Sequence, residues 1–561
     1  MQKLYTTEGE ALEGIPWEEY PRPQLRRGRW LCLNGEWTLS TDENGEGKIR
    51  VPFCPESLLS TCDKPVSYGS VLRYKRMFVI PTDWEGSRIL LHFGAVSSRC
   101  EVFVNGKKVC ENDNGYLGFF AEITKEVTYG GGENLLEVFA TNDLSGISPY
   151  GKQKIKRGGM WYTPVSGIWQ TVWLEPVPET YVKRLRIWTD EKGVRIRAEG
   201  VLEGVITCEG REYELSDGEV LIQPENPRTW SPESPELYEF SLRSGEDFVQ
   251  SYFALRSLTV EERNGIPRLC LNGKPYFFHA LLDQGYFCDG IYTPATPDAY
   301  EKDILTLKEL GFNALRKHVK VEPERFYYDC DRLGMAVLQD MVNNGDYRFL
   351  RDTVFPTFGM KRRSDKRMHS DPKAREAFLQ GMEGTVIQLA SHPCIVYWTI
   401  FNEGWGQFEA DQAYERFKAL GVDGFIDATS GWFHQNKSDV DSLHTYFEKL
   451  HLGKRRDLPQ VLSEFGGYVF KIPEHSFNTE KTYGYKIFAS REEYARAVRD
   501  IYVNDIAALA RRGLCASVFT QVSDVEDETN GILTYDRKRC KLKPSEMEGI
   551  AQALMEAVRS V

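Results

Sequence analysis

Apolar and polar positions alternate along the first part of the chain. From about residue 24 to 177, short alternating runs are separated by turn signals, as in residues 88–93 and in residues 101–104, which end at Asn105-Gly106. Alternation with a period of two residues is typical of strands that bury one face, and Asn-Gly closes tight hairpins. The pattern predicts an antiparallel β-sandwich for residues 1–180.

A second, shorter set of strand-like segments follows. Residues 185–188 and 194–198 alternate in the same way, and a proline-rich turn spans residues 226–235. About 75 residues with this pattern suit a small immunoglobulin-like β-sandwich. We therefore predict a second all-β domain for residues 181–258.

After Asn264-Gly265 the periodicity changes. Short apolar strands now alternate with helical patterns, such as residues 298–310, in which Ile304, Leu307 and Leu310 recur at helical spacing. Repeated strand–helix units predict a parallel sheet, and eight strands are enough to close a (β/α)8 barrel over residues 259–561. The predicted strands are 276–282, 313–318, 336–340, 395–401, 424–428, 442–446, 460–464 and 516–521.

A long loop separates the third barrel strand from the helix that is expected to start near Asp371. Long loops after barrel strands usually shape the rim of a site. This loop is basic, but a solvated loop is the simpler interpretation, and its role stays open. Its basic residues are Lys361, Arg362, Arg363, Lys366 and Arg367.

Composition excludes several classes of protein. The 70 basic and 82 acidic residues give a net charge of −12, with both signs spread along the chain, so no nucleic-acid surface is indicated. Twelve dispersed cysteines without a Cys-x-x-Cys pair favour free thiols and a cytoplasmic location. The sequence shows neither a leader pattern nor a membrane-spanning run, and it leaves a homo-oligomer open.

Two strand ends carry the residues with the clearest chemistry. In Trp398-Thr-Ile-Phe-Asn-Glu403-Gly-Trp-Gly an apolar strand ends in an amide, a carboxylate and glycine, and Val461-Leu-Ser-Glu464-Phe-Gly-Gly ends similarly three strands later. The two carboxylates should face each other across one barrel mouth. Such a pair can hydrolyse a glycosidic bond, one as acid/base and one as nucleophile, with retention if they lie about 5 to 5.5 Å apart. Arg316 is the candidate cation that keeps one of them ionised.

For most of these residues, taken singly, a purely structural role is also possible. A lone glutamate at a strand end is more often solvated, and Arg316 or His318 could form a structural ion pair. Trp432 could stack on a sugar ring or pack at the rim. The other candidate substrate-binding residues are His444, Tyr446 and Asp283. Four tryptophans of the first domain are interpreted mainly as packing residues: Trp37, Trp161, Trp169 and Trp173.

The combined motifs resemble glycoside hydrolase family 2, the family of β-galactosidases, β-glucuronidases and β-mannosidases. The first domain resembles the sugar-binding jelly roll of that family, in Leu-Asn-Gly-Glu-Trp37, Val-Pro-Phe-Cys-Pro-Glu56, Val-Asn-Gly-Lys107 and Thr-Pro-Val-Ser-Gly-Ile-Trp-Gln170. The barrel resembles its catalytic domain in Phe-Asn-Ala-Leu-Arg316-Lys-His318, Asn402-Glu403 and Ser-Glu464-Phe-Gly. The likeness covers nearly the whole chain.

The resemblance implies roles for particular residues. Glu403 would be the acid/base and Glu464 the nucleophile, and Asn402 would bond the sugar 2-hydroxyl. His318 and Tyr446 match a pocket histidine and a tyrosine beside the nucleophile. No cofactor is implied, and none of the nine histidines shows a close ligand spacing, so we predict no catalytic metal.

One departure from the family bears on the substrate. The β-glucuronidases carry an Asn-x-Lys element after strand eight, where this chain reads Ser-Asp-Val-Glu-Asp-Glu-Thr-Asn530, with four acids and no lysine. A negative rim would repel a uronic acid. We therefore expect a retaining exo-β-glycosidase that acts on a small β-galactoside or oligosaccharide. A β-uronidase of the same family is one alternative, and a non-catalytic carbohydrate-binding protein on this fold is the other.

Overall fold

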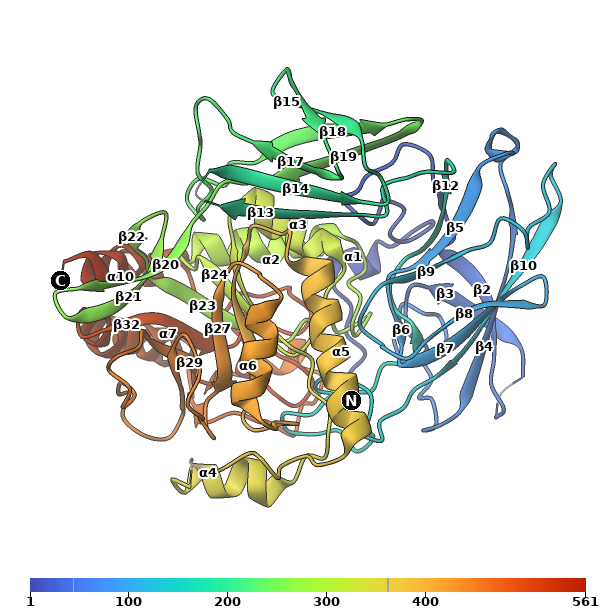
Figure 1. Ribbon diagram of the computed structural model, residues 1–561. Coiled ribbons are helices and arrows are strands. Elements are labelled where there is room, and N and C mark those ends of the chain that lie inside the picture. The colour runs from blue at the N-terminus through green and yellow to red at the C-terminus, as the bar shows by residue number, and fades with distance from the viewer. Residues whose placement is uncertain (44, 191, 361–362, 561) are drawn as a thin grey trace.

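The computed structural model describes residues 1–43, 45–190, 192–360 and 363–560. It is multidomain, as predicted: Figure 1 shows the N-terminal sandwich at the right, the second sandwich at the top, and both against a barrel. None of the described helices is long and apolar enough to cross a membrane. All twelve cysteines have free thiols, as their spacing predicted.

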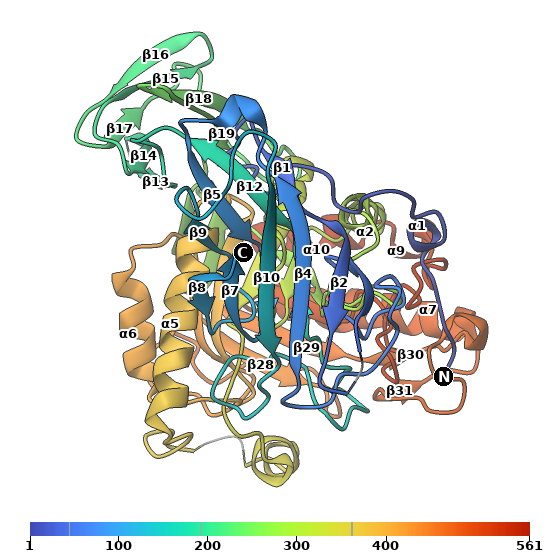
Figure 2. The same ribbon diagram turned by 90° about the vertical axis from the view of Figure 1, so that its right-hand side faces the viewer.

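The N-terminal domain packs a six-stranded sheet, seen face-on in Figure 2, against a four-stranded one. Inward residues alternate along each strand, as in Leu136, Val138 and Ala140 of β10, and together they fill one core. In spatial order the large sheet contains β3 (Gly47–Val51), β2 (Gly35–Ser40), β4 (Val71–Val79), β10 (Glu133–Thr141), β7 (Arg99–Val104) and β8 (Lys107–Asn112). The small sheet contains β1 (Leu31–Cys32), β12 (Val172–Val177), β5 (Arg88–Phe93) and β9 (Phe119–Glu122), and a separate pair joins β6 (Val96–Ser97) to β11 (Gly167–Ile168).

The second domain is a seven-stranded antiparallel sandwich with its own apolar core. Three strands facing four is the arrangement of a small immunoglobulin-like unit. One sheet contains β13 (Arg184–Asp190), β14 (Gly193–Glu199) and β17 (Glu219–Ile222). The other contains β16 (Arg211–Leu215), β15 (Gly204–Cys208), β18 (Tyr238–Ser244) and β19 (Asp247–Phe253). The domain boundaries at residues 180 and 258 stay predictions.

The barrel contains eight parallel strands, and each overlaps one of the predicted strands. They lie in the order β27-β26-β25-β24-β23-β32-β29-β28, and β27 and β28 are adjacent at the seam. Their bounds are β23 (Phe278–Asp283), β24 (Ala314–Lys317), β25 (Ala336–Asp340), β26 (Ile395–Asn402), β27 (Phe425–Ser430), β28 (Asp441–Thr445), β29 (Gln460–Gly466) and β32 (Leu514–Thr520). A three-stranded sheet of β20 (Leu258–Arg263), β21 (Ile266–Leu271) and β22 (Lys274–Pro275) precedes them.

Helices follow six of the eight barrel strands. Residues 431–440 and 446–459, which link β27 to β28 and β28 to β29, contain no helix, so the strict alternation expected from the sequence fails there. The longest helix, α5, begins where predicted, because Asp371 accepts hydrogen bonds from the amides of Lys373 and Ala374. The α-helices of the barrel are α2 (Asp298–Glu309), α3 (Glu324–Leu333), α4 (Phe355–Thr357), α5 (Pro372–Leu389), α6 (Ala410–Ala419), α7 (Arg491–Asp500), α8 (Ala507–Arg511), α9 (Pro544–Met547) and α10 (Ile550–Arg559), and α1 (Thr7–Glu10) lies near the N-terminus.

Residues 142–166, here called the crossing segment, leave the N-terminal sandwich after β10 and run against the barrel. The Gly345 amide donates to Gly146 at 2.7 Å, and the hydroxyl of Tyr150 donates to the Gly345 carbonyl at 2.9 Å. Asn344 Nδ2 donates to the carbonyl of Ile147 at 2.7 Å. These bonds fix the crossing segment on the loop after β25, which borders the C-terminal face of the barrel.

Candidate active site

The two glutamates meet at the C-terminal ends of their strands. Glu403 directly follows β26, and its amide donates to the carbonyl of Ser430 on β27 at 2.9 Å. Glu464 lies within β29. One carboxylate oxygen of each lies within 4.8 Å of the other. This separation suits a retaining pair, because an inverting pair needs room for a water and stands about 6.5 to 9.5 Å apart.

A sharp turn directly after β26 contains Glu403. Its own φ is +51°, and Gly404 (φ +74°) and Gly406 (φ +63°) follow in the left-handed region. Such angles are uncommon for a residue with a side chain and are frequent at sites where the backbone is tightly held. The glycines after the glutamate are therefore part of what places its carboxylate.

Arg316, at 0% exposure, connects the groups around the pair. Its Nε donates to Asp340 at 2.9 Å, one Nη donates to Glu464 at 3.1 Å, and the other donates to the Asn402 oxygen at 2.9 Å. Burial opposes the charged guanidinium, but Asp340 and Glu464 still raise the pKa of Arg316. The arginine thus lies beside Glu464 as a permanent cation, in the place that the sequence suggested.

The electrostatic environments of the two glutamates differ. Burial raises the pKa of Glu403 to about 7, although the charge of Lys152 and the neighbouring His318 oppose that rise. Glu464 instead receives hydrogen bonds from Arg316 and, at 2.6 Å, from the hydroxyl of Tyr446. One carboxyl group can therefore carry a proton near neutral pH beside another that is held by donors, which is the division of roles that acid/base and nucleophile require.

His444 lies between the two carboxylates. Its Nδ1 is 2.7 Å from Glu403 and 3.5 Å from Glu464, and burial lowers its pKa to about 3, so the ring is neutral. A guanidinium N–H can only donate, and one of Arg316 approaches the Nε2 of His444 at 3.4 Å. Nε2 is then the acceptor, and the ring proton on Nδ1 donates to Glu403.

Three further predicted residues line the same region. The Nδ2 of Asn402 is buried without a partner, so its amide protons remain for a ligand. His318 Nδ1 bonds Asp340 at 2.7 Å, and burial lowers the pKa of this histidine. The indole of Trp432 donates to the Glu403 carbonyl at 3.0 Å and meets His444 edge to face, so the ring supports the pair whether or not it also touches a sugar.

The structure does not bring Asp283 into this group. Asp283 pairs in register with Lys317 and binds its ammonium at 2.5 Å. Arg316 points into the barrel, and neighbouring side chains of a strand point to opposite faces, so Lys317 and Asp283 face the outer helices. There they share a small space with Ile304 and Leu307 of α2. The expectation that Asp283 binds substrate overlooked this alternation.

Several residues at the mouth were missed by sequence reasoning. Lys152, from the crossing segment, is 6% exposed and lies with its Nζ 4.7 Å from the ring centroid of Trp405. Trp405 in turn contacts Trp161, with centroids 5.4 Å apart, so a tryptophan interpreted as sandwich packing lies at the barrel mouth. The indole N–H of Trp405 is buried without a partner. Trp405 stands in the motif around Glu403 but was given no role, and nothing in the sequence links it to Lys152, because more than 200 positions separate Trp405 from the crossing segment.

The acidic segment after β32 is more neutral than its sequence indicated. Lys541 binds Asp524 at 2.6 Å, and Arg157 of the crossing segment binds Glu526 at 2.9 Å. Glu528 accepts hydrogen bonds from Tyr162 and Asn530, and burial raises its pKa. Two of the four acids are thus compensated by cations, which weakens the argument that a negative rim excludes uronic acids.

The basic loop after β25 is described only in part, because Lys361 and Arg362 lie outside the described residues. Arg363 and Arg367 line a cavity of about 490 Å³ together with Arg348 and Arg351. Arg348 and Arg351 are compensated by Asp346 and Asp352. The loop therefore borders a polar cavity, and its role stays open.

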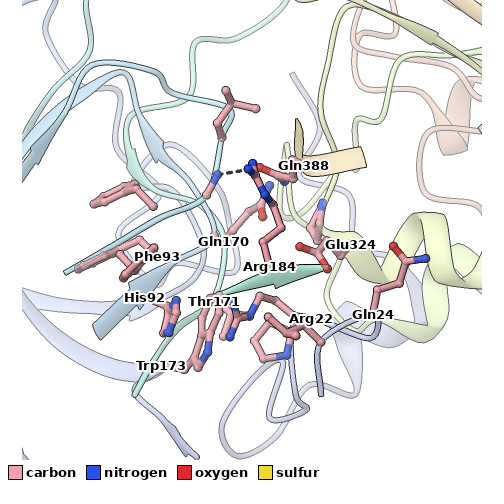
Figure 3. A pocket seen from close by; sticks show the side chains of 18 of the residues that line it. Arg22, Gln24, His92, Phe93, Gln170, Thr171, Trp173, Arg184, Glu324 and Gln388 are labelled. Atoms are coloured by element: carbon pink, nitrogen blue, oxygen red, sulfur yellow. Dashed lines mark hydrogen bonds between the residues drawn. The ribbon is translucent and has the colours of Figure 1, made fainter. Parts of the chain in front are cut away.

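A different cavity of about 490 Å³, drawn in Figure 3, lies where the N-terminal sandwich, the second sandwich and helix α5 meet. Figure 3 shows His92, Trp173 and Gln170 on the wall from the N-terminal sandwich, and Gln388 on the side of α5. It contains neither glutamate of the pair, so it is not the active site.

Glu403, His444 and Glu464 are also the one set of side chains, among those the structure describes, that could together hold a metal ion. Each already has protein partners: Glu403 and His444 bond each other, and Glu464 is held by Arg316 and Tyr446. Side chains that are already bonded to other protein groups in this way fit chemistry by two carboxylates that needs no metal ion. The absence of a catalytic metal stays a prediction.

Comparisons with known proteins agree with this architecture. The model described as "Glycosyl hydrolases family 2, TIM barrel domain" matches residues 269–505, and "Glycosyl hydrolases family 2, sugar binding domain" matches residues 57–178. Together they match well over half of the chain. The chain belongs to glycoside hydrolase family 2. Glu403 and Glu464 both lie within the part of the chain that the barrel-domain model of this family matches.

Curated relatives of this family member carry different activities in their names. A β-galactosidase of Thermoanaerobacter pseudethanolicus is 25% identical over 66% of this chain and 49% of the relative. A β-glucuronidase of Bacteroides fragilis is 22% identical over 66% of this chain and 56% of the relative. The chain spans about half the length of these relatives. The similarity therefore establishes the family of this chain. It does not establish the activity or the substrate of the whole relatives.

Solved structures resemble the chain over nearly its full length. A β-D-glucuronidase of Dictyoglomus thermophilum has a TM-score of 0.72 and 18% identity, and the match covers 97% of this chain and 99% of that one. A family 2 β-galacturonidase of Eisenbergiella tayi bound to galacturonate has a TM-score of 0.67 and 19% identity, covering 98% and 99%. At such identities the likeness establishes the three-domain fold alone.

Proposed function

We propose that the protein is a retaining exo-β-glycosidase that removes a terminal β-linked sugar by double displacement. The observation that carries the proposal is the approach of the Glu403 and Glu464 carboxylates to within 4.8 Å inside one barrel mouth. At that range one carboxylate can bond the anomeric carbon while the other reaches the leaving oxygen.

The first half-reaction follows from the two environments. Glu464 attacks the anomeric carbon, and the glycosidic carbon–oxygen bond breaks as Glu403 delivers its proton to the leaving oxygen. Arg316 supports this step by neutralising the charge around Glu464 while Asn402 offers its free amide to a ring hydroxyl. The products are a free aglycone alcohol and a sugar esterified to Glu464.

The second half-reaction returns the enzyme to its starting state. Glu403, now ionised, accepts a proton from water, and the water oxygen bonds the anomeric carbon as the ester to Glu464 breaks. Two inversions leave the released sugar in its original β-configuration. His444, which donates to Glu403, favours the ionised form that this step needs.

The sugar is the open part of the proposal. A β-galactoside is the first candidate, supported by the buried carboxyl of Glu528 after β32 and by relatives named β-galactosidase. A β-uronide is the second candidate, favoured by the ion pairs that neutralise Asp524 and Glu526 and by the ammonium of Lys152 at the mouth. The two substrates differ at C6, which is a hydroxymethyl group in one and a carboxylate in the other.

A panel of p-nitrophenyl glycosides tests both parts. We expect turnover of the β-galactoside, and faster turnover of the β-glucuronide or β-galacturonide would replace it as substrate. Proton NMR of the first product should show the β-anomer before mutarotation. Release of the α-anomer first would contradict the retaining mechanism, and binding of sugars without any turnover would favour a non-catalytic carbohydrate-binding protein.

A further inference from the structure

Lys152 is a buried cation that the reaction described above does not use. Its side chain comes from the N-terminal domain but lies at the mouth of the barrel, with Nζ 4.7 Å from the ring centroid of Trp405 and 5.8 Å from that of Trp161. Only 6% of the residue is exposed. Within the described part of the chain, no carboxylate lies within 4.0 Å of Nζ and no hydrogen-bond acceptor is assigned to it.

The ammonium of Lys152 lies against two aromatic faces and, among the described residues, has no acid as an ion-pair partner, although the residue as a whole is largely buried. Buried lysines are normally paired with an acid. Donors that are held in place but left without acceptors are what a protein keeps for a ligand that supplies the acceptors.

The surroundings of Lys152 place its charge over the reacting region. Its charge acts on the carboxyl groups of Glu403, which follows β26, and of Glu528, which follows β32. It also acts on His318, which follows β24. These three groups follow three different barrel strands, and the ammonium itself lies against Trp405, two residues after Glu403.

The crossing segment holds Lys152 rigidly in that position. Before it, Tyr150 bonds the barrel loop at Asn343 and Gly345. After it, Tyr162 bonds Glu528, and Arg157 binds Glu526. These contacts anchor the segment to the barrel on both sides of Lys152.

We propose that Lys152 is a substrate-contacting residue, whose ammonium donates hydrogen bonds to an oxygen substituent of the sugar in the pocket, so that the N-terminal domain completes the site in the barrel. This inference rests on the proposed function. The acceptor is an oxygen on the ring, either a hydroxyl of a neutral sugar or the carboxylate of a uronic acid, and substrates of the two kinds distinguish them.

The test removes the charge of Lys152 but keeps a side chain of similar size. Lys152→Met keeps an unbranched apolar stem against the two tryptophans. Lys156→Met is the matched control, because Lys156 lies on the same segment, is exposed and loses the same charge. We expect Lys152→Met to lower kcat/KM by about 10- to 100-fold, the usual effect of losing a hydrogen bond to a charged group, and Lys156→Met to leave it unchanged.

Two readouts separate substrate contact from a structural role. Loss of the Lys152 charge should move the alkaline limb of the pH–rate profile upward, because that charge lowers the pKa of Glu403. The melting temperature of Lys152→Met should stay close to that of the wild type, because no ion pair among the described residues is lost and methionine keeps the packing against the two tryptophans. A lowered melting temperature with an unmoved profile would make Lys152 a structural residue and overturn the inference.

Substrates identify the acceptor. A larger loss on a β-galacturonide than on a β-galactoside, which differ only at C6, assigns the contact to a carboxylate, and the reverse assigns it to a hydroxyl. A change of less than twofold on both overturns the role of Lys152 while leaving the proposed function intact.

A wild type that is inactive on the whole panel would instead contradict the proposed function. Calorimetric titration with galactose and with glucuronic acid then decides the role of Lys152. Binding that Lys152→Met weakens supports the contact, and binding that is equal in both proteins, or absent from both, refutes it.

Discussion

Arg316 shows how much of the site depends on single side chains. One guanidinium contacts Asp340 on β25, Asn402 on β26 and Glu464 on β29. A planar fork of five donors can satisfy several acceptors at fixed angles, which a lysine could not do. The relative positions of the Asn402 amide and the Glu464 carboxylate are therefore set by one residue, and the two glutamates differ mainly through their neighbours.

Replacing Glu464 by alanine should abolish double displacement. Without the nucleophile no glycosyl ester forms, so kcat should fall by several powers of ten while sugar binding persists. Added azide should restore turnover and give the α-glycosyl azide, because it attacks from the vacated face. Glu403→Ala with azide should give the β-anomer, and the opposite pair of products would exchange the two roles.

The pH dependence of the rate should report Glu403. Its pKa is raised to about 7 by burial, and the acid must be protonated to assist the leaving group, so kcat/KM should fall as the pH rises through about 7. In Glu403→Gln, measured with a dinitrophenyl glycoside that needs no acid, this alkaline limb should disappear. An unchanged limb in that variant would assign it to another group.

At the scale of elements, the turn after β26 determines where the side chain of Glu403 points. A β-carbon on Gly406 would lie 2.5 Å from the carbonyl oxygen of Asn344, which is backbone of the loop that also binds the crossing segment. The left-handed φ of this glycine adds strain for any other residue. The strand end, the loop after β25 and the crossing segment are thus packed as one unit.

Gly406→Ala should lower both stability and activity. A left-handed alanine alone costs about 1–2 kcal/mol, and here a backbone contact is added to that cost. Gly210→Ala is the control, since Gly210 has φ +75° but no atom within 4 Å of an added β-carbon. Thermal melting should show a larger decrease in melting temperature for Gly406→Ala than for Gly210→Ala. Equal decreases would mean that the loop after β25 moves to accommodate the added β-carbon.

The barrel strands were predictable because each is an apolar run that ends in polar residues or glycine. The helices expected between β27 and β29 were not found, since residues 431–440 and 446–459 are too short or too irregular for an amphipathic helix. Asp283 was predicted to bind substrate, but its side chain faces the outer helices, because neighbouring side chains of a strand point to opposite faces. Trp405 stands in the motif around Glu403, but its contact with Lys152 was unpredictable, because only the tertiary fold brings the two residues together.

At the scale of the whole molecule, buried ion pairs join the domains. Glu175 on β12, at 0% exposure, binds Arg22 at 2.8 Å and Arg27 at 3.2 Å, and Arg27 also binds Asp247 of the second sandwich at 2.8 Å. Arg256, which follows that sandwich, donates to the carbonyl of Ile395 at the start of β26. The domains therefore meet through specific polar contacts.

Glu175→Gln should destabilise the protein. Burial opposes ionisation, but Arg22 and the other cations still hold the pKa of Glu175 below its usual range, so its contribution to stability is present above the ordinary pKa of a glutamate and is lost as the pH falls. Removing one charge of a buried cluster costs about 3–5 kcal/mol. Melting at pH 7 should show a clear loss, whereas Glu179→Gln, at a 91% exposed side chain, should show none.

The crossing segment gives the catalytic pocket a wall made by a different domain. The two facing glutamates belong to the barrel, whereas Lys152 and Trp161, which lie at its mouth, belong to a segment of the N-terminal domain. Changes in that segment can retune which glycoside is accepted while the cleaving residues stay intact.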